Sequence, residues 1–452
     1  MENRDKVTEI ARMVNRAGGR AMLVGGCVRD ALLGIPVKDY DLEIYGLDFP
    51  GLLRAVAPVC EVDAVGMSFG VLKVRHFEID MAFPRRENKT GAGHRGFVIE
   101  VDPAMDFSLA SARRDFTVNA IMQDALTGEI IDPHGGRKDL QEKRLRHVSP
   151  AFAEDPLRVL RAMQFIGRFG LVPEKSTITL CAGLSQNELP RERIAAEWEK
   201  LLRQGKYMVA ALNFLRECRW VRFYPELAAL IGCPQDPQWH PEGDVWNHTL
   251  LVLQAAAELR KNPEDVLPFM LAAICHDFGK AGCTETDSRG RITSRGHDTL
   301  TGAAERFVCG IWNSSQLWEK VEKLIVSHMH PWQLADGNAS DKAYRKLACR
   351  VGRTDLLADL AEADVRGIAM SDHERICRLE MVEVFRRRCR ELEISGHAPQ
   401  PLVMGRHLII RNLTPGPEFK KILDECFEAQ LAGHFNTVDG AMKYLDGLLC
   451  GK

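Results

Sequence analysis

The stretch MLVGGCVRDALLGIPVKDYDLE, residues 22–43, decides the fold expected for the first part of the chain. It predicts a short apolar strand, a turn at Gly25 and Gly26, a helix, and a second strand that carries Asp39 and Asp41. Because glycine has no Cβ atom, the backbone at this turn can approach a ligand closely, and the N–H groups at the helix start favour an anion such as phosphate. The turn is therefore a candidate phosphate-binding element.

The two aspartates predict a metal site. Asp39 and Asp41 are two residues apart, so on a strand they project to the same face. Two carboxylates this close repel each other unless a cation lies between them, and Mg²⁺ prefers hard oxygen ligands while keeping positions for substrate phosphates. Alone, a Gly-Gly turn is most often a tight turn and an Asp-x-Asp strand a solvated face. The two together, at this spacing, indicate a function.

A further strand is expected over residues 76–83, with one apolar and one acidic face. Glu78 and Asp80 alternate with apolar residues there, so a third carboxylate can reach the metal pair. The next segment, PRRENKTGAGHRG at 84–96, is polar and contains glycines, and it predicts a loop.

Bulk properties narrow the class of protein. A chain of 452 residues should hold several domains, and 45% hydrophobic with 27% charged residues is typical of a soluble protein. The formal net charge is only −2, so a nucleic acid would have to be held by local basic segments. The candidates are 137–147, 345–353 and 386–390, each of which could also be a solvated helix face.

The cysteine pattern and the hydropathy predict a cytoplasmic protein. Thirteen cysteines are scattered without a CxxC pair, which indicates reduced thiols. The first residues mix both charges and lack an apolar core of signal-peptide length, and no run is apolar enough to span a bilayer.

The order GGxVRDxLLG followed by DxD resembles the nucleotidyltransferase motif of the class II CCA-adding enzymes and bacterial poly(A) polymerases. These enzymes add nucleotides to RNA 3′ ends without a nucleic-acid template. RRDFTVNA at 113–120 is similar to a second motif of this family, and 128–170 match the family almost without a break.

The resemblance implies roles for single residues. Asp39, Asp41 and Asp80 would be the catalytic carboxylates, with Mg²⁺ held by the first two. The family pattern lines up with DMAFPR at 80–85 and so favours Asp80 over Glu78. The residues expected to bind the nucleotide and its triphosphate are Gly25, Gly26, Arg29, Arg114, Asp115, Asn119, Glu154, Asp155, Arg158 and Arg161.

The segment EDPLRVLR, residues 154–161, suits base selection. By itself, Asp155 before a proline predicts a capped helix, with Arg158 and Arg161 on one face. Cytosine and adenine present an amino donor beside a ring-nitrogen acceptor, whereas guanine and uracil present a carbonyl beside an N–H. A carboxylate only accepts and a guanidinium only donates, so Asp155 with Arg158 complements C and A. The EDxxR motif of the family is described in these terms.

A second site is expected from Asp244 onward, where histidines and aspartates lie on or beside apolar helical segments. One such histidine is usually a satisfied core residue. Six residues in the order H, HD, H, H, D resemble the HD superfamily of metal-dependent phosphohydrolases. The expected ligands of a transition metal (Ni, Mn, Fe or Zn) are His248, His276, Asp277 and Asp364, and a second metal ion could be held by His297 and His328. A degenerate domain kept for packing or dimerisation is the alternative.

The fold class expected from the resemblance is α/β plus all-α: a small mixed-sheet nucleotidyltransferase head, followed by an elongated all-helical neck, body, HD domain and tail. The expected domains are the head (1–140), a neck and body with the base-selecting motif and RNA binding (141–236), an HD domain (237–372) and a tRNA-binding helical tail (373–452). The segment CPQDPQWHP at 233–241 holds three prolines and predicts a linker.

The expected function is the addition of C, C and A to tRNA 3′ ends from CTP and ATP, with release of pyrophosphate and with an HD phosphatase or 2′,3′-cyclic phosphodiesterase activity. We expect tRNA, ATP and CTP as partners, no membrane and no DNA, and either a monomer or a homodimer. A split enzyme that adds only CC or only A shares every motif quoted. A poly(A) polymerase would carry a basic GRRF-like segment where GMSFGVLKV stands at 66–74. The chain could also be chiefly an HD phosphohydrolase whose head binds tRNA.

Overall fold

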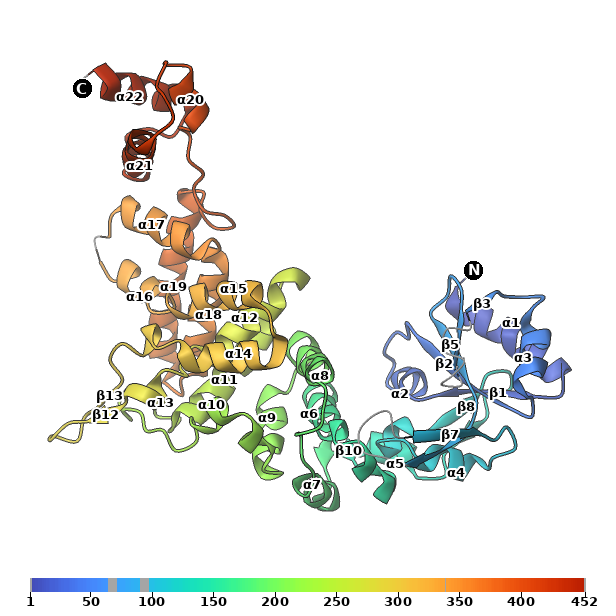
Figure 1. Cartoon of the computed structure of the whole chain (residues 1–452). Coiled ribbons are helices and arrows are strands. Elements are labelled where there is room, and N and C mark those ends of the chain that lie inside the picture. The colour runs from blue at the N-terminus through green and yellow to red at the C-terminus, as the bar shows by residue number, and fades with distance from the viewer. Residues whose placement is uncertain (1, 64–70, 90–96, 338, 451–452) are drawn as a thin grey trace. The chain divides into compact units, whose positions relative to one another are not determined.

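The computed structural model describes residues 2–63, 71–89, 97–337 and 339–450 (Figure 1). The chain divides into two compact units. Unit 1 comprises Met1–Glu197 and Asn213–Trp220, and unit 2 comprises Trp198–Leu212 and Val221–Lys452.

A seven-stranded mixed sheet forms the centre of the first part of unit 1. Its strand order is β3-β4-β5-β2-β1-β8-β9, in which β2 and β5 are parallel and the other neighbouring pairs are antiparallel. The strands are β1 (Arg20–Val24), β2 (Tyr40–Tyr45), β3 (Val62–Asp63), β4 (Val71–Val74), β5 (Ile79–Ala82), β8 (Met122–Asp124) and β9 (Ile130–Ile131).

The two faces of this sheet differ. Helices α1 (Asn3–Arg16) and α3 (Phe49–Val56) cover one face, where their apolar residues share a core with alternate strand residues such as Leu42 and Met81. Because side chains alternate along a strand, Asp41 and Asp80 lie on the opposite face. There, α4 (Phe107–Ala112) packs on Met22 and Val24 of β1.

Some expected boundaries change. Strand β2 begins at Tyr40, so Asp39 precedes the strand that was expected to carry it. The loop predicted over 84–96 is wrong for 85–89, because β6 (Arg85–Lys89) pairs antiparallel with β7 (Phe97–Val101). Backbone hydrogen bonds between two neighbouring segments here outweigh the polar composition of the first. Residues 90–96 lie outside the described residues.

The remainder of the chain is mostly helical, and the predicted fold class, a mixed-sheet head before helical parts, is confirmed. Helix α2 (Gly26–Leu32) connects β1 to β2. The helices between the sheet and the second candidate site are α5 (Gly136–Gln141), α6 (Leu157–Phe169), α7 (Lys175–Ala182), α8 (Arg191–Gln204), α9 (Met208–Glu217) and α10 (Pro225–Ala228). Short strands β10 (Arg144–Leu145) and β11 (Val172–Pro173) pair beside α6.

Unit 2 ends in a long series of helices (Figure 1). They are α11 (Val245–Leu259), α12 (Pro263–Cys275), α13 (Lys280–Cys283), α14 (Gly302–Trp312), α15 (Ser315–Ile325), α16 (His330–Ala335), α17 (Asp341–Val351), α18 (Thr354–Gly367), α19 (Asp372–Glu391), α20 (Gly405–Ile409), α21 (Pro417–Leu431) and α22 (Val438–Cys450). Strands β12 (Glu285–Thr286) and β13 (Ile292–Thr293) form a small hairpin. Within the described ranges, every helix is too short or too polar to cross a bilayer.

Candidate active sites

The acidic face of the head sheet carries the first candidate site. Asp41 of β2 and Asp80 of β5 are partners in register across a parallel strand pair, and Asp39 comes two residues before Asp41. A Cβ atom at Gly25 would lie 3.2 Å from Arg114 Nη1 and 3.8 Å from Asp41 Oδ2, and the backbone there has φ +73°. The structure therefore brings the predicted carboxylates, the glycine turn and Arg114 to one place.

The Asp41 carboxylate lies near two other negative charges, those of Asp39 and Asp80. Asp41 is solvent-exposed as a residue, but protein atoms around its carboxylate partly shield that group from water, and this raises its pKa. Arg114 lowers this pKa, while the charges of Asp80 and Asp39 raise it further. Carboxylate oxygens are the donor type that Mg²⁺ prefers, although among the described residues the groups of three ligand atoms that converge within 4.8 Å all lie in unit 2.

Glu43 is a buried carboxylate of this site that the sequence reasoning missed. It is 1% exposed, and its Oε1 lies 2.9 Å from Arg113 Nη2 and 3.6 Å from Arg114 Nη2. Its Oε2 accepts a hydrogen bond from the Tyr45 hydroxyl at 2.8 Å. Glu43 thus anchors both arginines beside the open carboxylates. The period of two that relates Asp41 to Glu43 on one strand face was the signal for it.

Four of the predicted nucleotide-binding residues are bonded to one another. Arg29, which is 5% exposed, donates to Asn119 Oδ1 at 2.7 Å and to Asp30 Oδ1 at 2.6 Å. Asn119 donates to Asp115 Oδ1 at 2.9 Å, and Arg161 donates to Asp115 Oδ2 at 2.8 Å. Burial opposes the charge on Asp115, yet Arg161 and Asn119 hold the pKa of this carboxyl below its ordinary value. The network joins α2 to α6.

The predicted helix cap at Asp155 is displaced by one residue. Helix α6 begins at Leu157 with Pro156 as its N-cap residue, although Asp155 Oδ1 still accepts a hydrogen bond from the Leu157 N–H at 3.1 Å. The Asp155 side chain is thereby held at the start of the helix that carries Arg158. Glu154 is exposed, at the end of a 3₁₀ turn over Pro150–Glu154.

Asp155 and Arg158 each have other partners. Arg193 Nη2 of α8 lies 2.8 Å from Asp155 Oδ2. Arg158 donates to the carbonyl oxygens of Ala151 and Arg113, at 2.8 and 2.6 Å. Arg193 is thus a second residue that the sequence reasoning missed, and no local signal connects positions 38 residues apart.

The second candidate site lies in unit 2 and contains four imidazoles whose Nδ1 atoms are all held. His248 Nδ1 is 2.9 Å from Glu242 Oε1. The Nδ1 atoms of His276, His297 and His328 lie 2.9, 2.8 and 2.7 Å from backbone carbonyl oxygens. An Nδ1 that donates leaves Nε2 with a free lone pair, which is the form that binds a metal ion.

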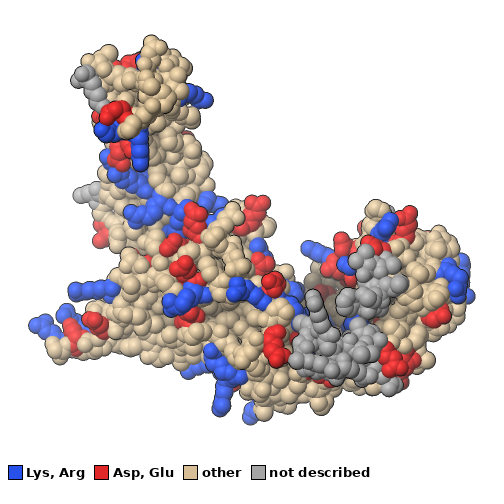
Figure 2. Space-filling model, viewed as in Figure 1, with Lys and Arg blue, Asp and Glu red and all other residues tan. Residues whose placement is uncertain are grey.

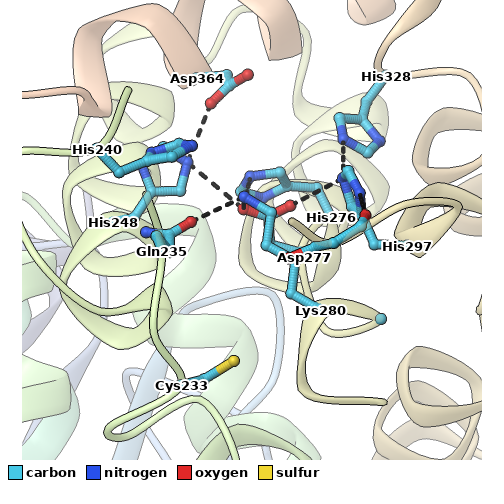
Figure 3. A network of polar contacts seen from close by, with 12 residues as sticks. Cys233, Gln235, His240, His248, His276, Asp277, Lys280, His297, His328 and Asp364 are labelled. Carbon is cyan, nitrogen blue, oxygen red and sulfur yellow. Dashed lines mark hydrogen bonds and ion pairs between the residues drawn. The ribbon is translucent and has the colours of Figure 1, made fainter. Parts of the chain in front are cut away.

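Asp277 lies between two groups of ligands (Figure 3). Its Oδ2 is 3.3 Å from His276 Nε2 and 3.6 Å from His248 Nε2, and its Oδ1 is 3.2 Å from His297 Nε2. His297 Nε2 in turn lies 3.2 Å from His328 Nε2. The six predicted residues therefore converge, in the groups His248, His276, Asp364 and Asp277, His297, His328.

These residues fit a bound transition metal. Asp364 Oδ1 lies 3.0 Å from His248 Nε2, yet the buried Nε2 atoms of His248 and His276 have no aligned hydrogen-bond partner within the part of the chain that the structure describes. A lone pair facing a carboxylate is unfavourable unless a cation lies between them. Burial lowers the pKa of His248, but Asp364 and Glu242 outweigh it and raise that pKa to about 9, so a proton is held where a metal ion could bind. Burial and the neighbouring His276 lower the pKa of His328 to about 4.

Glu242 orients this site, and it is a third residue that the sequence reasoning missed. Its Oε1 accepts from both His240 and His248, each at 2.9 Å, and its Oε2 accepts from the Ala369 N–H at 3.1 Å. Burial opposes its charge, but the His240 and His248 hydrogen bonds hold its pKa well below the ordinary value. Glu242 is on a loop before α11, where no periodicity marks it.

A pocket of about 460 Å³ opens beside the metal-ligand residues. Its lining includes Asp277, His297, His328 and Asp364, and it also includes residues of the segment 233–241 that was predicted as a linker. That segment lies within unit 2.

The three predicted basic segments are partly neutralised by acidic partners. Figure 2 shows Lys and Arg interspersed with Asp and Glu. The ion pairs include Arg146 with Asp139, Arg353 with Asp265 and Asp355, and Arg386 with Asp359 and Glu362. Formal charge runs in the sequence therefore overstate the free positive charge.

Two families match the chain. Residues 21–146 match the poly A polymerase head domain, and residues 245–366 match the HD domain. Each match covers less than a third of the chain, so it describes one segment and not the whole protein. The two matched ranges contain the head carboxylates and the six predicted HD residues. Glu154, Asp155, Glu242 and the site residues of α6 and α8 lie outside them.

Curated relatives include proteins named multifunctional CCA protein. That of Xylella fastidiosa strain M23 is 42% identical over 273 residues, which are 58% of this chain and 63% of the relative. That of Actinobacillus pleuropneumoniae serotype 5b is 40% identical over 275 residues, 59% of this chain and 64% of the relative. The chain thus matches less than two thirds of the length of these relatives.

Solved structures share the fold over nearly the full chain. The Bacillus stearothermophilus CCA-adding enzyme in complex with CTP aligns with a TM-score of 0.63 at 20% identity, covering 100% of this chain and 98% of that one. The Thermotoga maritima CCA-adding enzyme complexed with tRNA aligns with a TM-score of 0.56 at 16% identity, covering 98% and 94%. At this identity the likeness concerns the fold.

Proposed function

We propose that this chain adds C, C and A to the 3′ end of tRNA from CTP and ATP, and that its HD domain is a metal-dependent phosphohydrolase. The observation that carries the first part is the register of Asp41 with Asp80 beside Gly25 and Arg114. Carboxylates for metal ions next to a glycine turn and an arginine are what nucleotidyl transfer from a triphosphate requires. The names of the curated relatives support CCA as the added sequence.

In the head, each residue has a part in positioning the substrates. Asp39 and Asp41, with Asp80, would hold Mg²⁺, which when bound would supply Lewis-acid activation of the RNA 3′-hydroxyl and neutralise charge on the triphosphate. Gly25 and Gly26 let the triphosphate approach the backbone. Arg114 binds the triphosphate, since its Nη1 lies beside the glycine turn, 3.2 Å from where a Cβ atom at Gly25 would stand.

The base is selected by Asp155 and Arg158. The carboxylate accepts from the exocyclic amino group of C or A, and the guanidinium donates to the ring nitrogen beside it. Because a carboxylate has about four acceptor sites, Asp155 can keep its contact with Arg193 while it binds a base. The hydrogen-bonded network of Arg29, Asn119, Asp115 and Arg161 holds α2 and α6 together beside the nucleotide. Glu154 contributes from its exposed position next to Asp155.

In the HD domain, His248, His276, Asp277 and Asp364 hold a transition metal (Ni, Mn, Fe or Zn), with His297 and His328 for a second. A bound metal ion supplies an activated water for attack on a phosphate ester. Glu242 fixes the orientation of His248, and Lys280 Nζ, 2.7 Å from Asp277 Oδ2, neutralises part of the cluster's negative charge.

The remaining assignments depend on this function. The domain boundaries near residues 140, 236 and 372 and tRNA binding by the tail at 373–452 belong to the same proposal. All thirteen cysteines are free thiols, which supports a reducing, cytoplasmic compartment.

The test uses three tRNA transcripts, which end before CCA, after the first C and after CC. Each is incubated with labelled CTP or ATP and Mg²⁺. We expect ordered addition of C, C and A that then stops. Addition of only CC or only the final A would indicate a split-function enzyme, and an unbounded A tail would indicate a poly(A) polymerase. No incorporation, together with phosphate-ester hydrolysis, would leave the head as a tRNA-binding module.

A further inference from the structure

Trp239 is an unusual residue of the HD pocket. It lies in the segment 233–241 and is 54% exposed, whereas Trp198, Trp220 and Trp246 are fully buried. Exposing an indole costs free energy unless a ligand covers it, because the ring is among the largest apolar side-chain surfaces. Trp239 lines the same pocket as the metal-ligand residues. Its position beside the metal-ligand residues indicates that the exposed indole contacts a ligand.

The backbone holds Trp239 in a fixed position. The N–H groups of Trp239 and His240 both donate to the Asp236 carbonyl, at 3.0 and 2.9 Å, and prolines flank this turn on both sides. Glu242, three residues after Trp239, is hydrogen-bonded to His248. The backbone that carries the indole is thus bonded within this turn, three residues from a residue that contacts the metal-ligand cluster.

Arg378 of α19 lies next to the Trp239 ring in the same pocket. Its Cζ lies 5.7 Å from the centroid of the Trp239 ring, and it also lines the pocket. A guanidinium over an indole face is a cation–π pair, and both groups stack on planar aromatic ligands. Trp332, Met329 and Met381 line the pocket as well. The pocket lining therefore combines the metal-ligand residues with aromatic, apolar and cationic side chains.

We infer that Trp239 and Arg378 form a base-stacking wall, so that the HD site selects phosphate esters of nucleosides over esters without a base. The two kinds of lining residue match the two parts of a nucleotide: the metal-ligand residues suit the phosphate, and Trp239 suits the planar base. The volume of about 460 Å³ lies in the range of small-molecule sites. This inference rests on the proposed phosphohydrolase function and names its specificity residues.

Stacking reads only the π-face of a base, so the wall should accept more than one base. The chemistry fits a free nucleotide and equally the last nucleotide of an RNA 3′ end that carries a phosphate. These two sources differ only in whether the ribose is joined to an RNA chain, and the experiment separates them.

The test compares esters with and without a base, on the full chain loaded with Ni²⁺. The KM is measured for adenosine 2′-phosphate and for glycerol 2-phosphate, and the dissociation constant of adenosine is measured by calorimetry. Trp239→Ala should raise the KM for adenosine 2′-phosphate and the dissociation constant of adenosine by about tenfold or more. It should leave the KM for glycerol 2-phosphate within about twofold.

Conservative and matched variants separate stacking from folding. Trp239→Phe should retain most of the adenosine affinity, and Arg378→Met should lose part of it. Tyr207→Ala removes another exposed aromatic residue of unit 2, 44% exposed and outside the pocket lining, and should change nothing. An RNA oligonucleotide ending in a 2′-phosphate serves as a third substrate. A higher KM for it in Trp239→Ala supports the wall and extends it to RNA ends, and an unchanged KM with a raised mononucleotide KM supports the wall for free nucleotides.

The inference is overturned if Trp239→Ala leaves adenosine binding unchanged, or if it raises the KM of both small esters equally, as a merely structural residue would. The failure of the proposed function looks different. If the wild-type chain hydrolyses none of these esters, the phosphohydrolase proposal fails, while the adenosine titration still decides whether Trp239 binds a base.

Discussion

The two candidate sites hold their metal ligands in opposite ways. In the head, Asp39 and Asp41 are exposed and sit at the start of a strand, with arginines anchored behind them by the buried Glu43. In the HD domain, His248 and His276 are buried, and each Nδ1 is held by an acceptor. An open carboxylate site can exchange nucleotide with metal, whereas a buried imidazole site retains its metal and receives only the substrate.

This difference predicts where each site is fragile. The head should fail through its supporting charges, because its exposed carboxylates lie beside arginines that the buried Glu43 anchors. The HD site should fail through the residues that orient imidazoles, because its ligands are already converged. Substitutions at the supporting residues of each site test this difference. The largest effect is expected on the stability of the head.

Glu43→Gln should destabilise the head by about 3 kcal/mol, because it leaves Arg113 and Arg114 beside a neutral buried group. Urea unfolding measures this. Glu129→Gln, which removes a 61% exposed partner of Arg20, is the control and should cost at most about 0.5 kcal/mol. Equal effects of the two substitutions would mean that burial of Glu43 is not what matters.

Glu242→Gln should weaken metal binding at the HD site by about 10- to 100-fold, since an amide oxygen holds the His248 Nδ1–H less strongly than a carboxylate does. Competition between the protein and a chelating dye for Ni²⁺ measures the affinity. Glu258→Gln, at a 62% exposed position of α11, should leave it unchanged. An unaltered affinity in Glu242→Gln would show that His248 needs no second partner.

Gly25→Ala should raise the KM for CTP about tenfold, because the new methyl group would lie 3.2 Å from Arg114 Nη1, and a positive φ costs an alanine about 1 kcal/mol. Gly18→Ala is a matched control, with φ +85° and nothing within 4 Å of its Cβ atom. If both variants bind CTP normally, close approach at Gly25 plays no part in triphosphate binding.

Arg193→Met should lower the preference for CTP over UTP by about fivefold, because Asp155 loses the charged partner that orients it. The expected effect is small because a partly exposed ion pair contributes little free energy. Misincorporation of U into a tRNA lacking CCA measures the preference. Arg191→Met, at an exposed position of the same helix, should keep it. Unchanged selectivity in Arg193→Met would assign orientation of Asp155 to the helix start alone.

The ligand types were predictable from the sequence because they lie in short patterns. Alternation along a strand predicted that Asp39 and Asp41 share a face, although Asp39 in fact precedes β2. Alternation also placed Asp80 on an acidic strand face, and the ordered histidines and aspartates predicted the HD cluster. The contacts of Arg29 with Asn119 and of Arg193 with Asp155 span 90 and 38 residues, so only the folded chain reveals them. The segment 233–241 shows the same limit: its prolines predicted a linker, whereas it lines the HD pocket.

The central claim is that one chain holds two independent active sites, and a double dissociation tests it most directly. Asp41→Asn and the pair His276→Ala with Asp277→Ala are each assayed for C and A incorporation into tRNA and for Ni²⁺-dependent hydrolysis of adenosine 2′-phosphate. We predict that Asp41→Asn loses incorporation by about a thousandfold, since a bound metal ion contributes several kcal/mol, and keeps hydrolysis. The HD variant should lose hydrolysis and keep incorporation. Loss of both activities in either variant, or incorporation that survives Asp41→Asn, would contradict the account.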